Sequence, residues 1–114
     1  MRYAMVIVKP NAEWEALSET EGDYYSIIHW GIELKARGKI VAGAELAAAY
    51  RTAGVSWPDQ EPILADQPCL DGTGTVGGFL ILSVDSADEA LEIASSWPTR
   101  AGVRIEVRPI VGNW

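Results

Sequence analysis

The chain has little of several things, and each shortage excludes a class of protein. It has one cysteine and one histidine among 114 residues, so it has no internal disulfide framework and cannot build a metal site from soft ligands. Lysine and arginine number 9 against 16 acidic residues, for a formal net charge of -7. Because the basic residues are scattered, no positive patch for a nucleic-acid backbone is expected.

Long apolar runs are also missing. The segment before Lys9 and Pro10 has too few apolar residues for a signal-peptide core or a membrane span. With one cysteine, we expect a cytoplasmic protein in a reducing compartment. Apolar residues make up 48% and charged residues 22% of the chain, a globular balance. A chain this short has room for one core, so we expect a single domain over residues 1–114.

The glycine-rich segment Leu70–Leu82, LDGTGTVGGFLIL, contains the spacing G-x-G-x-x-G at Gly72, Gly74 and Gly77. In a dinucleotide-binding site such glycines follow a strand and open a helix, whose N–H groups meet the phosphates. Here a short apolar run of strand formers follows them, and no helical periodicity begins before Ala87. We therefore expect a loop that enters a buried strand, and no bound nucleotide.

Apolar periodicity and turn residues divide the chain into two similar halves. Each half is predicted as strand, helix, strand, and a Ser-x-x-Glu capping box opens each helix, at Ser18–Glu21 and Ser86–Glu89. Between the halves we expect a hairpin that pairs Ala53–Trp57 with Pro62–Asp66 across a polar turn. The strands are expected at Arg2–Val8, Lys39–Leu46, Gly78–Val84 and Val103–Val107, and the helices are expected to end near Gly38 and Pro98. The alanines after Leu46 also suit a helix.

This order of elements predicts a ferredoxin-like α+β fold, an antiparallel sheet with two helices on one face. The strand segments 5–8 and 79–82 are apolar at every position, so the face away from the helices is expected to be apolar too. One chain of this length has nothing left to cover that face. A second copy would cover it, which predicts a homodimer, sheet against sheet, with a cavity between the sheets. Five tryptophans suit such an interface, although they also suit an ordinary core.

Several pieces of the chain, in order and spacing, resemble the YCII-related proteins, some of which are named for a DGPF motif. A loop with Trp14 follows the first strand, His29 lies on the first helix, and GKIVAGAEL follows at 38–46. The tetrapeptide Asp66-Gln67-Pro68-Cys69 stands where the family has DGPF, and Gly77-Gly78-Phe79 follows at the family's distance from the aspartate. The pieces VDSADEALEIA and IEVRPI complete a resemblance over nearly the whole chain.

The resemblance implies the dimeric α/β barrel and a site that pairs the helix histidine with the aspartate of the motif, here His29 with Asp66. An aspartate that accepts the Nδ1–H of an imidazole fixes its tautomer and raises its basicity, so the other nitrogen can take a proton. Such a pair needs no metal and no cofactor. The implied chemistry is proton transfer on a small organic acid or lactone, as in isomerisation, lyase or dehalogenation reactions, and related barrels act on muconolactones.

The residues themselves leave other interpretations open. The packed face of the first helix is predicted to consist of Tyr24, Ile27, Ile28 and Ile32. His29 falls at the edge of this face, where it also suits a surface or interfacial role, and Asp66 could cap a turn. Arg104 and Arg108 share one face of the last strand with Glu106. These arginines would bind an anionic substrate at the mouth of the cavity or simply face water.

The motif itself departs from the family pattern. Gln67 and Cys69 replace its glycine and phenylalanine, and Asp71–Gly74 replaces the acidic, hydroxylated and basic residues usual before the glycine pair. Because packing loops tolerate such changes better than catalytic loops, they favour a non-catalytic dimer that binds a ligand or a protein, or a structural role. Some relatives are linked to transcription initiation factors. No basic residue lies near Cys69 in sequence to lower the pKa of its thiol, so we expect an unreactive thiol.

Overall fold

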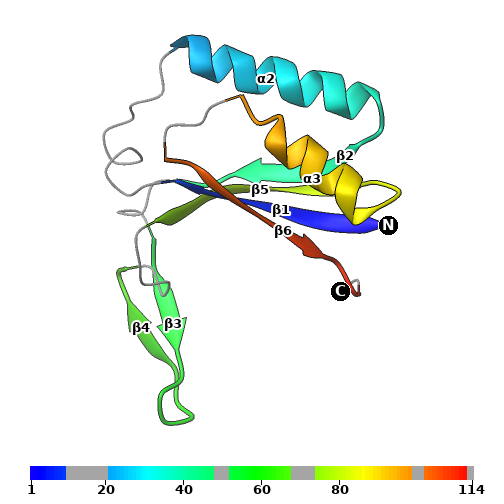
Figure 1. The fold of residues 1–114 in the computed structure, drawn as a ribbon. Coiled ribbons are helices and arrows are strands. Elements are labelled where there is room, and N and C mark those ends of the chain that lie inside the picture. Colours follow the sequence, from blue (N-terminus) through cyan, green and yellow to red (C-terminus); the bar gives the residue numbers. More distant parts are fainter. Residues whose placement is uncertain (10–20, 48–51, 68–73, 99–101, 113–114) are drawn as a thin grey trace.

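The main body is a four-stranded antiparallel sheet with two helices on one face (Figure 1). The computed structural model describes residues 1–9, 21–47, 52–67, 74–98 and 102–112. In spatial order the strands are β2 (Ile40–Glu45), β5 (Thr75–Ser83), β1 (Arg2–Lys9) and β6 (Arg104–Pro109), and the helices are α2 (Glu21–Ala36) and α3 (Ala87–Ser95). The expected ferredoxin-like α+β fold is confirmed. The residues Ser18–Thr20 of the first capping box lie outside the described residues.

From Gly74 on, where the structure describes it, the glycine-rich segment forms a strand as expected, but this strand starts at Thr75 rather than at Gly78. Ile7 pairs with Gly78 and Val8 with Val76, so Gly77 is the extra residue of a bulge in β5. A Cβ at Gly77 would lie 3.2 Å from the Lys9 side chain. A Cβ at Gly78 would lie 2.9 Å from the carbonyl oxygen of Ala44 on β2. These glycines therefore let neighbouring strands and the Lys9 side chain approach closely.

The core lies between the sheet and the helices. Alternate residues of β1 point into it, and Met5 and Leu82 are fully buried at its centre. Burial of a side chain of this size stabilises the fold by about 1.5–3 kcal/mol. The described core residues are Tyr3, Met5, Ile7, Leu34, Leu82, Val84, Ala90, Ile93 and Trp97. Ile27, Trp30 and six further half-buried apolar residues pack around them.

The second capping box forms as expected and is joined to the neighbouring strand. The Ser86 side chain accepts a hydrogen bond from the Glu89 N–H at 3.1 Å, which caps α3. The Glu89 carboxylate accepts the Asp85 N–H at 2.9 Å, one residue before the cap. The same carboxylate forms an ion pair with Lys39. The start of α3 is thereby fixed next to the start of β2.

The predicted hairpin is present but shorter, with β3 (Gly54–Ser56) paired to β4 (Ile63–Ala65) in a separate two-stranded sheet. It projects from the side of the main sheet opposite to the helices (Figure 1). Residues 52–67, which contain both strands and their turn, are called the arm below. Gln60 in the turn has a φ of 72°, a left-handed conformation that costs a non-glycine residue about 1 kcal/mol.

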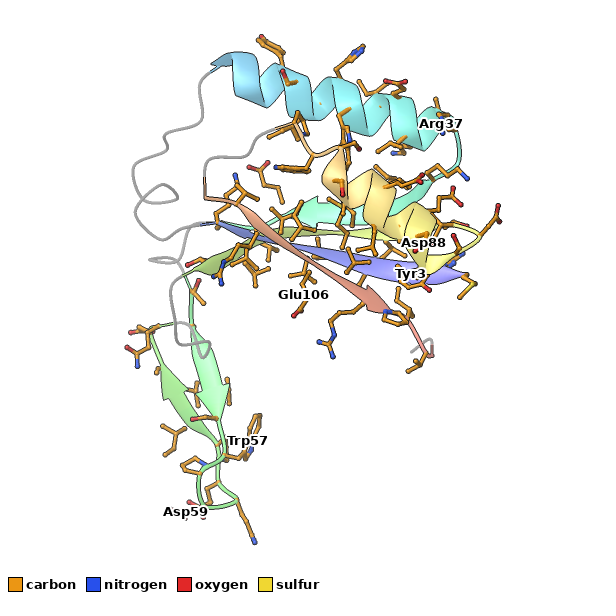
Figure 2. The ribbon with its side chains drawn as sticks, in the orientation of Figure 1. Tyr3, Arg37, Trp57, Asp59, Asp88 and Glu106 are labelled. Carbon is orange, nitrogen blue, oxygen red and sulfur yellow. The ribbon has the colours of Figure 1, made fainter. Side chains whose placement is uncertain are left out.

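The sheet face turned away from the helices is apolar along its central strands and charged at one edge. We call it the far face; by alternation from the pairing it includes Arg2, Ala4, Val6 and Val8 of β1, Phe79 and Ile81 of β5, and Arg104, Glu106 and Arg108 of β6. Figure 2 shows Glu106 pointing away from the helices. Phe79 is 37% exposed. The predicted apolar far face is therefore present on β1 and β5, while β6 contributes charges.

Candidate functional site

The predicted histidine lies on the outer side of α2. Its residues that pack toward the core are Ile27, Trp30 and Leu34, and His29 falls on the opposite side of the helix and is exposed. Of the face expected from sequence, Ile27 does pack against the core, but the prediction is wrong for Ile28 and Ile32, which are 39% and 63% exposed. Apolar residues occur on several sides of α2, so periodicity did not single out the packed face.

The other predicted site residues lie on the opposite side of the sheet. Asp66 directly follows β4 and is exposed on the arm. Arg104 and Arg108 lie on the far face with Glu106 between them. Figure 1 places α2 and the arm on opposite sides of the main sheet, so the single chain does not bring His29 and Asp66 together. Cys69 lies outside the described residues.

A pocket of about 250 Å³ opens between α2 and the sheet; we call it the α2 pocket. Most of its lining is apolar, with two tryptophans, and its charged lining residues are Lys9 and Glu45. The lining residues are Ile7, Lys9, Ile27, Trp30, Gly31, Ile40, Ala44, Glu45, Gly77, Gly78, Phe79, Leu80 and Trp97. A concave apolar site with a few polar groups is the usual form of a small-molecule site.

Lys9 and Glu45 are the last residues of β1 and β2, the two strands that flank β5. Lys9 is the last residue of β1, and its aliphatic chain lies over Gly77, where a Cβ would be 3.2–3.4 Å from its carbons. Glu45 is the last residue of β2 and pairs with Gly78. Both charges therefore belong to the end of the pocket at which β1 and β2 terminate. An ammonium group there can hold an anion, and a carboxylate can accept a proton or a hydroxyl hydrogen.

Two tryptophans also line the pocket. The rings of Trp30 and Trp97 pack edge to face. The Trp30 indole N–H donates to the Ser96 hydroxyl at 2.8 Å, and that hydroxyl donates to the Ile93 carbonyl at 2.6 Å. The indole is thus held in place by a hydrogen bond as well as by packing. Neither tryptophan was predicted as a site residue from sequence, where the number of tryptophans in a short chain was the only signal.

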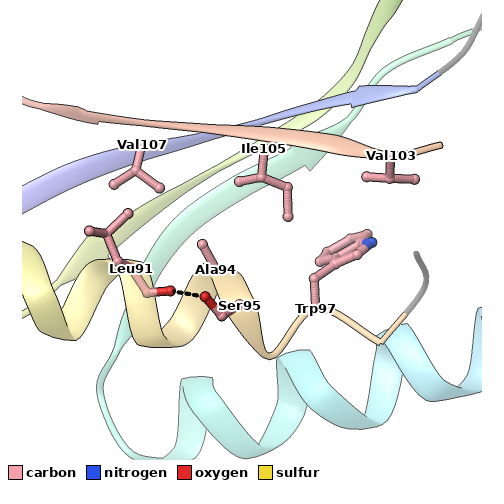
Figure 3. Close-up of a pocket in the computed structure, with 7 residues that line it drawn as sticks. All are labelled: Leu91, Ala94, Ser95, Trp97, Val103, Ile105 and Val107. Atoms are coloured by element: carbon pink, nitrogen blue, oxygen red, sulfur yellow. Dashed lines mark hydrogen bonds between the residues drawn. The ribbon is translucent and has the colours of Figure 1, made fainter. Parts of the chain in front are cut away.

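A second groove of about 320 Å³ lies between α3 and β6 (Figure 3). Its lining is Leu91, Ala94, Ser95, Trp97, Val103, Ile105 and Val107. Ser95 is the one hydroxyl in this lining, and it donates to the Leu91 carbonyl at 2.7 Å within the helix (Figure 3). The groove therefore has little polar chemistry to orient a ligand. The α2 pocket is the better candidate site.

One carboxylate in the described part of the chain has a clearly shifted pKa. The hydrogen bond from Lys39, then that from the Asp85 N–H, hold the pKa of Glu89 below its ordinary value. This group lies at the start of α3 and belongs to the capping structure. The shift is therefore a matter of stability rather than of catalysis.

The sequence was compared with models of known protein families. The model of the YCII-related domain matches residues 1–112. The chain belongs to the YCII-related family. A comparison with curated proteins gives no match. Within the described part of this YCII-related domain, no helix is long and apolar enough to cross a membrane. The same residues contain no group of three or more His, Cys, Asp or Glu side chains placed to hold a metal ion.

Proposed function

We propose that residues 1–114 form one YCII-related domain that acts as a cytoplasmic homodimer and binds a small organic acid or lactone in the α2 pocket. The observation that carries this proposal is the combination of an apolar lining with Lys9 and Glu45 at one end of the pocket. The volume of about 250 Å³ lies just below the usual range for ligand sites, which suits a small ligand. The apolar far face, on which Phe79 is 37% exposed, supports the dimer.

The polar groups define the class of ligand. A ligand with a flat or apolar body would lie against Trp30 and Trp97, and its carboxylate or ring oxygen would face Lys9. Glu45 would accept a hydrogen from a hydroxyl group and would repel a second carboxylate at the same end. The expected ligand therefore carries one anionic or strongly accepting group.

The binding test uses the tryptophans of the pocket as reporters. Benzoate, methyl benzoate and a γ-lactone are titrated against the protein while tryptophan fluorescence is followed. We expect benzoate to bind, and Lys9→Met to raise its dissociation constant about tenfold by removing the charge while keeping the chain over Gly77. Lys35→Met, outside this pocket, is the matched control and should leave binding unchanged.

A second variant tests the location of the ligand. A Cβ at Gly31 meets nothing within 4 Å, and Gly31 lines the pocket. Gly31→Leu should therefore add a side chain to the lining without straining the helix backbone, and it should weaken the binding of benzoate. Unchanged binding in Gly31→Leu, or no response of the wild type to any probe, would contradict the proposal.

The second candidate is proton transfer by His29 with Asp66 in a homodimer. The observation that favours it is the direction of the arm, which carries Asp66 away from its own α2 to the side where a second protomer would pack (Figure 1). Direct contact between the two residues then requires two chains. If the pair forms, Asp66→Asn changes the NMR chemical shifts of the His29 ring; an unchanged ring removes this candidate.

A further inference from the structure

The arm is a small two-stranded hairpin that exposes large apolar side chains to solvent. Its strands have three residues each, and an isolated hairpin of this size is at best marginally stable. Val55 pairs with Leu64, so these two side chains share a face. Leu64 is 76% and Trp57 60% exposed. Something other than the described part of its own chain is needed to cover the arm.

A second unpartnered apolar surface lies at the β2 edge of the main sheet. There, between α2 and β2, is a groove of about 310 Å³, which we call the edge groove. Its lining is Ile28, Gly31, Ile32, Lys35, Ile40, Val41, Ala42, Gly43 and Leu80. Ile32 is 63% and Val41 43% exposed. Among the described strands β2 is the outermost of its sheet, and within this part of the chain its outer backbone edge has no partner strand.

The charges of the two surfaces are opposite. The arm carries Asp59, Glu61 and Asp66 and has no lysine or arginine. The charged residue in the lining of the edge groove is Lys35. In a chain with a net charge of -7, an acidic arm finds few surfaces that do not repel it, and an apolar groove with a lysine is one of them.

The two surfaces cannot meet within one chain. The edge groove is formed on the helix side of the sheet by α2, whereas the arm projects from the other side (Figure 1). Figure 2 shows Trp57 and Asp59 at the outer end of the arm, far from the helices. An arm that extends past the sheet of a second copy would reach the helix side of that copy. A two-fold pair would use both arms and both grooves in the same way.

We propose that the arm of each protomer docks in the edge groove of a second copy of this chain. The Val55 and Leu64 face covers Ile32 and Val41, and Asp59 and Glu61 lie near Lys35. This inference rests on the homodimer of the proposed function and adds a second contact to the packing of the far faces. It also explains why a short hairpin without its own core is stable.

The first experiment is sedimentation of the full chain at several concentrations. Leu64→Asp on the arm and Ile32→Asp in the groove should each weaken the dimer at least about tenfold, because each places a charge in an apolar contact. Leu91→Asp is the matched control, since Leu91 is an exposed leucine on α3 outside the groove. It should leave the dimer unchanged. Circular dichroism establishes that each variant is folded.

The second experiment exchanges the charges. Asp59→Lys with Glu61→Lys reverses the arm, and Lys35→Glu reverses the groove, so each variant alone should dimerise more weakly than the wild type. An equimolar mixture should recover a mixed dimer, because the basic arm of one chain then meets the acidic groove of the other. Glu33→Lys with Glu92→Lys, two exposed positions on the helices, makes the same change in net charge. Mixed with Lys35→Glu it should dimerise more weakly than the arm variant does, because only one of the two arm–groove contacts is then complementary.

The outcomes separate this inference from the proposed function. Wild-type affinity in Leu64→Asp, or no recovery in the mixture, overturns arm docking. If Val6→Asp on the far face breaks the dimer while Leu64→Asp does not, the arm proposal fails and the far-face dimer stands. A wild type that is monomeric at every concentration overturns both dimer contacts, and binding of benzoate in the α2 pocket is then judged separately by fluorescence.

Discussion

The indole rings of Trp30 and Trp97 meet edge to face, with their centroids 5.2 Å apart and their planes at 79°. Trp30 belongs to α2 and Trp97 follows α3, so the contact joins the two helices over the sheet. The hydrogen bond from the Trp30 indole N–H to the Ser96 hydroxyl connects the same two parts of the chain. An aromatic pair of this geometry contributes about 0.5–1.5 kcal/mol beyond its burial. This wall of the α2 pocket is therefore also a structural connection.

Substitutions of Trp30 should separate packing from hydrogen bonding. Trp30→Phe keeps a ring but loses the N–H donor, and we expect a loss of about 1 kcal/mol in the free energy of unfolding. Trp30→Ala removes the ring as well and should cost about 3 kcal/mol. Urea denaturation measures both. In the Trp30→Phe background Ser96→Ala should cost less than in the wild type; equal costs would show that the hydrogen bond contributes nothing.

The ion pair of Glu89 with Lys39 predicts a dependence of stability on pH. The hydrogen bond with Lys39 and that with the Asp85 N–H lower the pKa of Glu89 from its ordinary value of 4.5. The folded state therefore favours the ionised carboxylate, and this stabilisation is present above 4.5 and is lost as pH falls through the lowered pKa. Glu89→Gln should lower the denaturation midpoint at neutral pH, and its difference from the wild type should vanish in acid.

Glu92→Gln supplies the control for that series, because Glu92 is an exposed carboxylate of the same helix. It should change the midpoint little at any pH. Since the Glu89 pair is partly exposed, high salt should also reduce the difference between Glu89→Gln and the wild type. A difference that persists in acid would mean that the substitution acts through the cap alone.

Two glycines should respond oppositely to alanine. Gly31 lies inside α2, where a Cβ meets nothing within 4 Å, so Gly31→Ala should raise the free energy of unfolding by about 1 kcal/mol. At Gly43 in β2 a Cβ would lie 2.8 Å from the Phe79 carbonyl oxygen. Gly43→Ala should therefore push β2 from β5 and destabilise the sheet. Thermal denaturation of both variants checks the contrast, and a stabilising Gly43→Ala would contradict the packing described.

The turn of the arm predicts a stabilising substitution. Gln60 has a φ of 72°, which glycine adopts without steric cost. Gln60→Gly should stabilise the hairpin by about 1 kcal/mol, less the entropy that glycine gains in the unfolded chain. Amide hydrogen exchange of residues 54–56 and 63–65 measures it. Gln67 at the other end of the arm has no positive φ, so Gln67→Gly should not stabilise the hairpin.

Much of the fold could be predicted because its signals are local. The apolar run of Arg2–Val8, the Ser86–Glu89 box and the polar turn of the arm each depend on a few neighbouring residues. The bulge at Gly77 could not be predicted, since it depends on the register between two strands far apart in sequence. For that reason β5 begins before the position expected from its apolar residues.

The site was less predictable, because contacts across the chain create it. Trp30 and Ser96 are separated by 66 positions, and nothing local to either residue indicates the other. The apolar surface of α2 is wide, so the residues that face the sheet could not be told from those that stay exposed. The pairing of His29 with Asp66 comes from the family resemblance, and it stays a prediction.

Because of its bulge, β5 contains one residue, Gly77, that has no partner in the pairing with β1. Loss of Gly77 from a relative would leave Gly78 opposite Ile7 and Val76 opposite Val8, so every other side chain would keep its side of the sheet. Loss of a neighbour within the regular part of β5 would instead exchange inside and outside along the remaining strand. Evolutionary changes in the length of β5 should therefore be tolerated at Gly77. This residue lies next to the Lys9 side chain, which packs there because glycine has no Cβ.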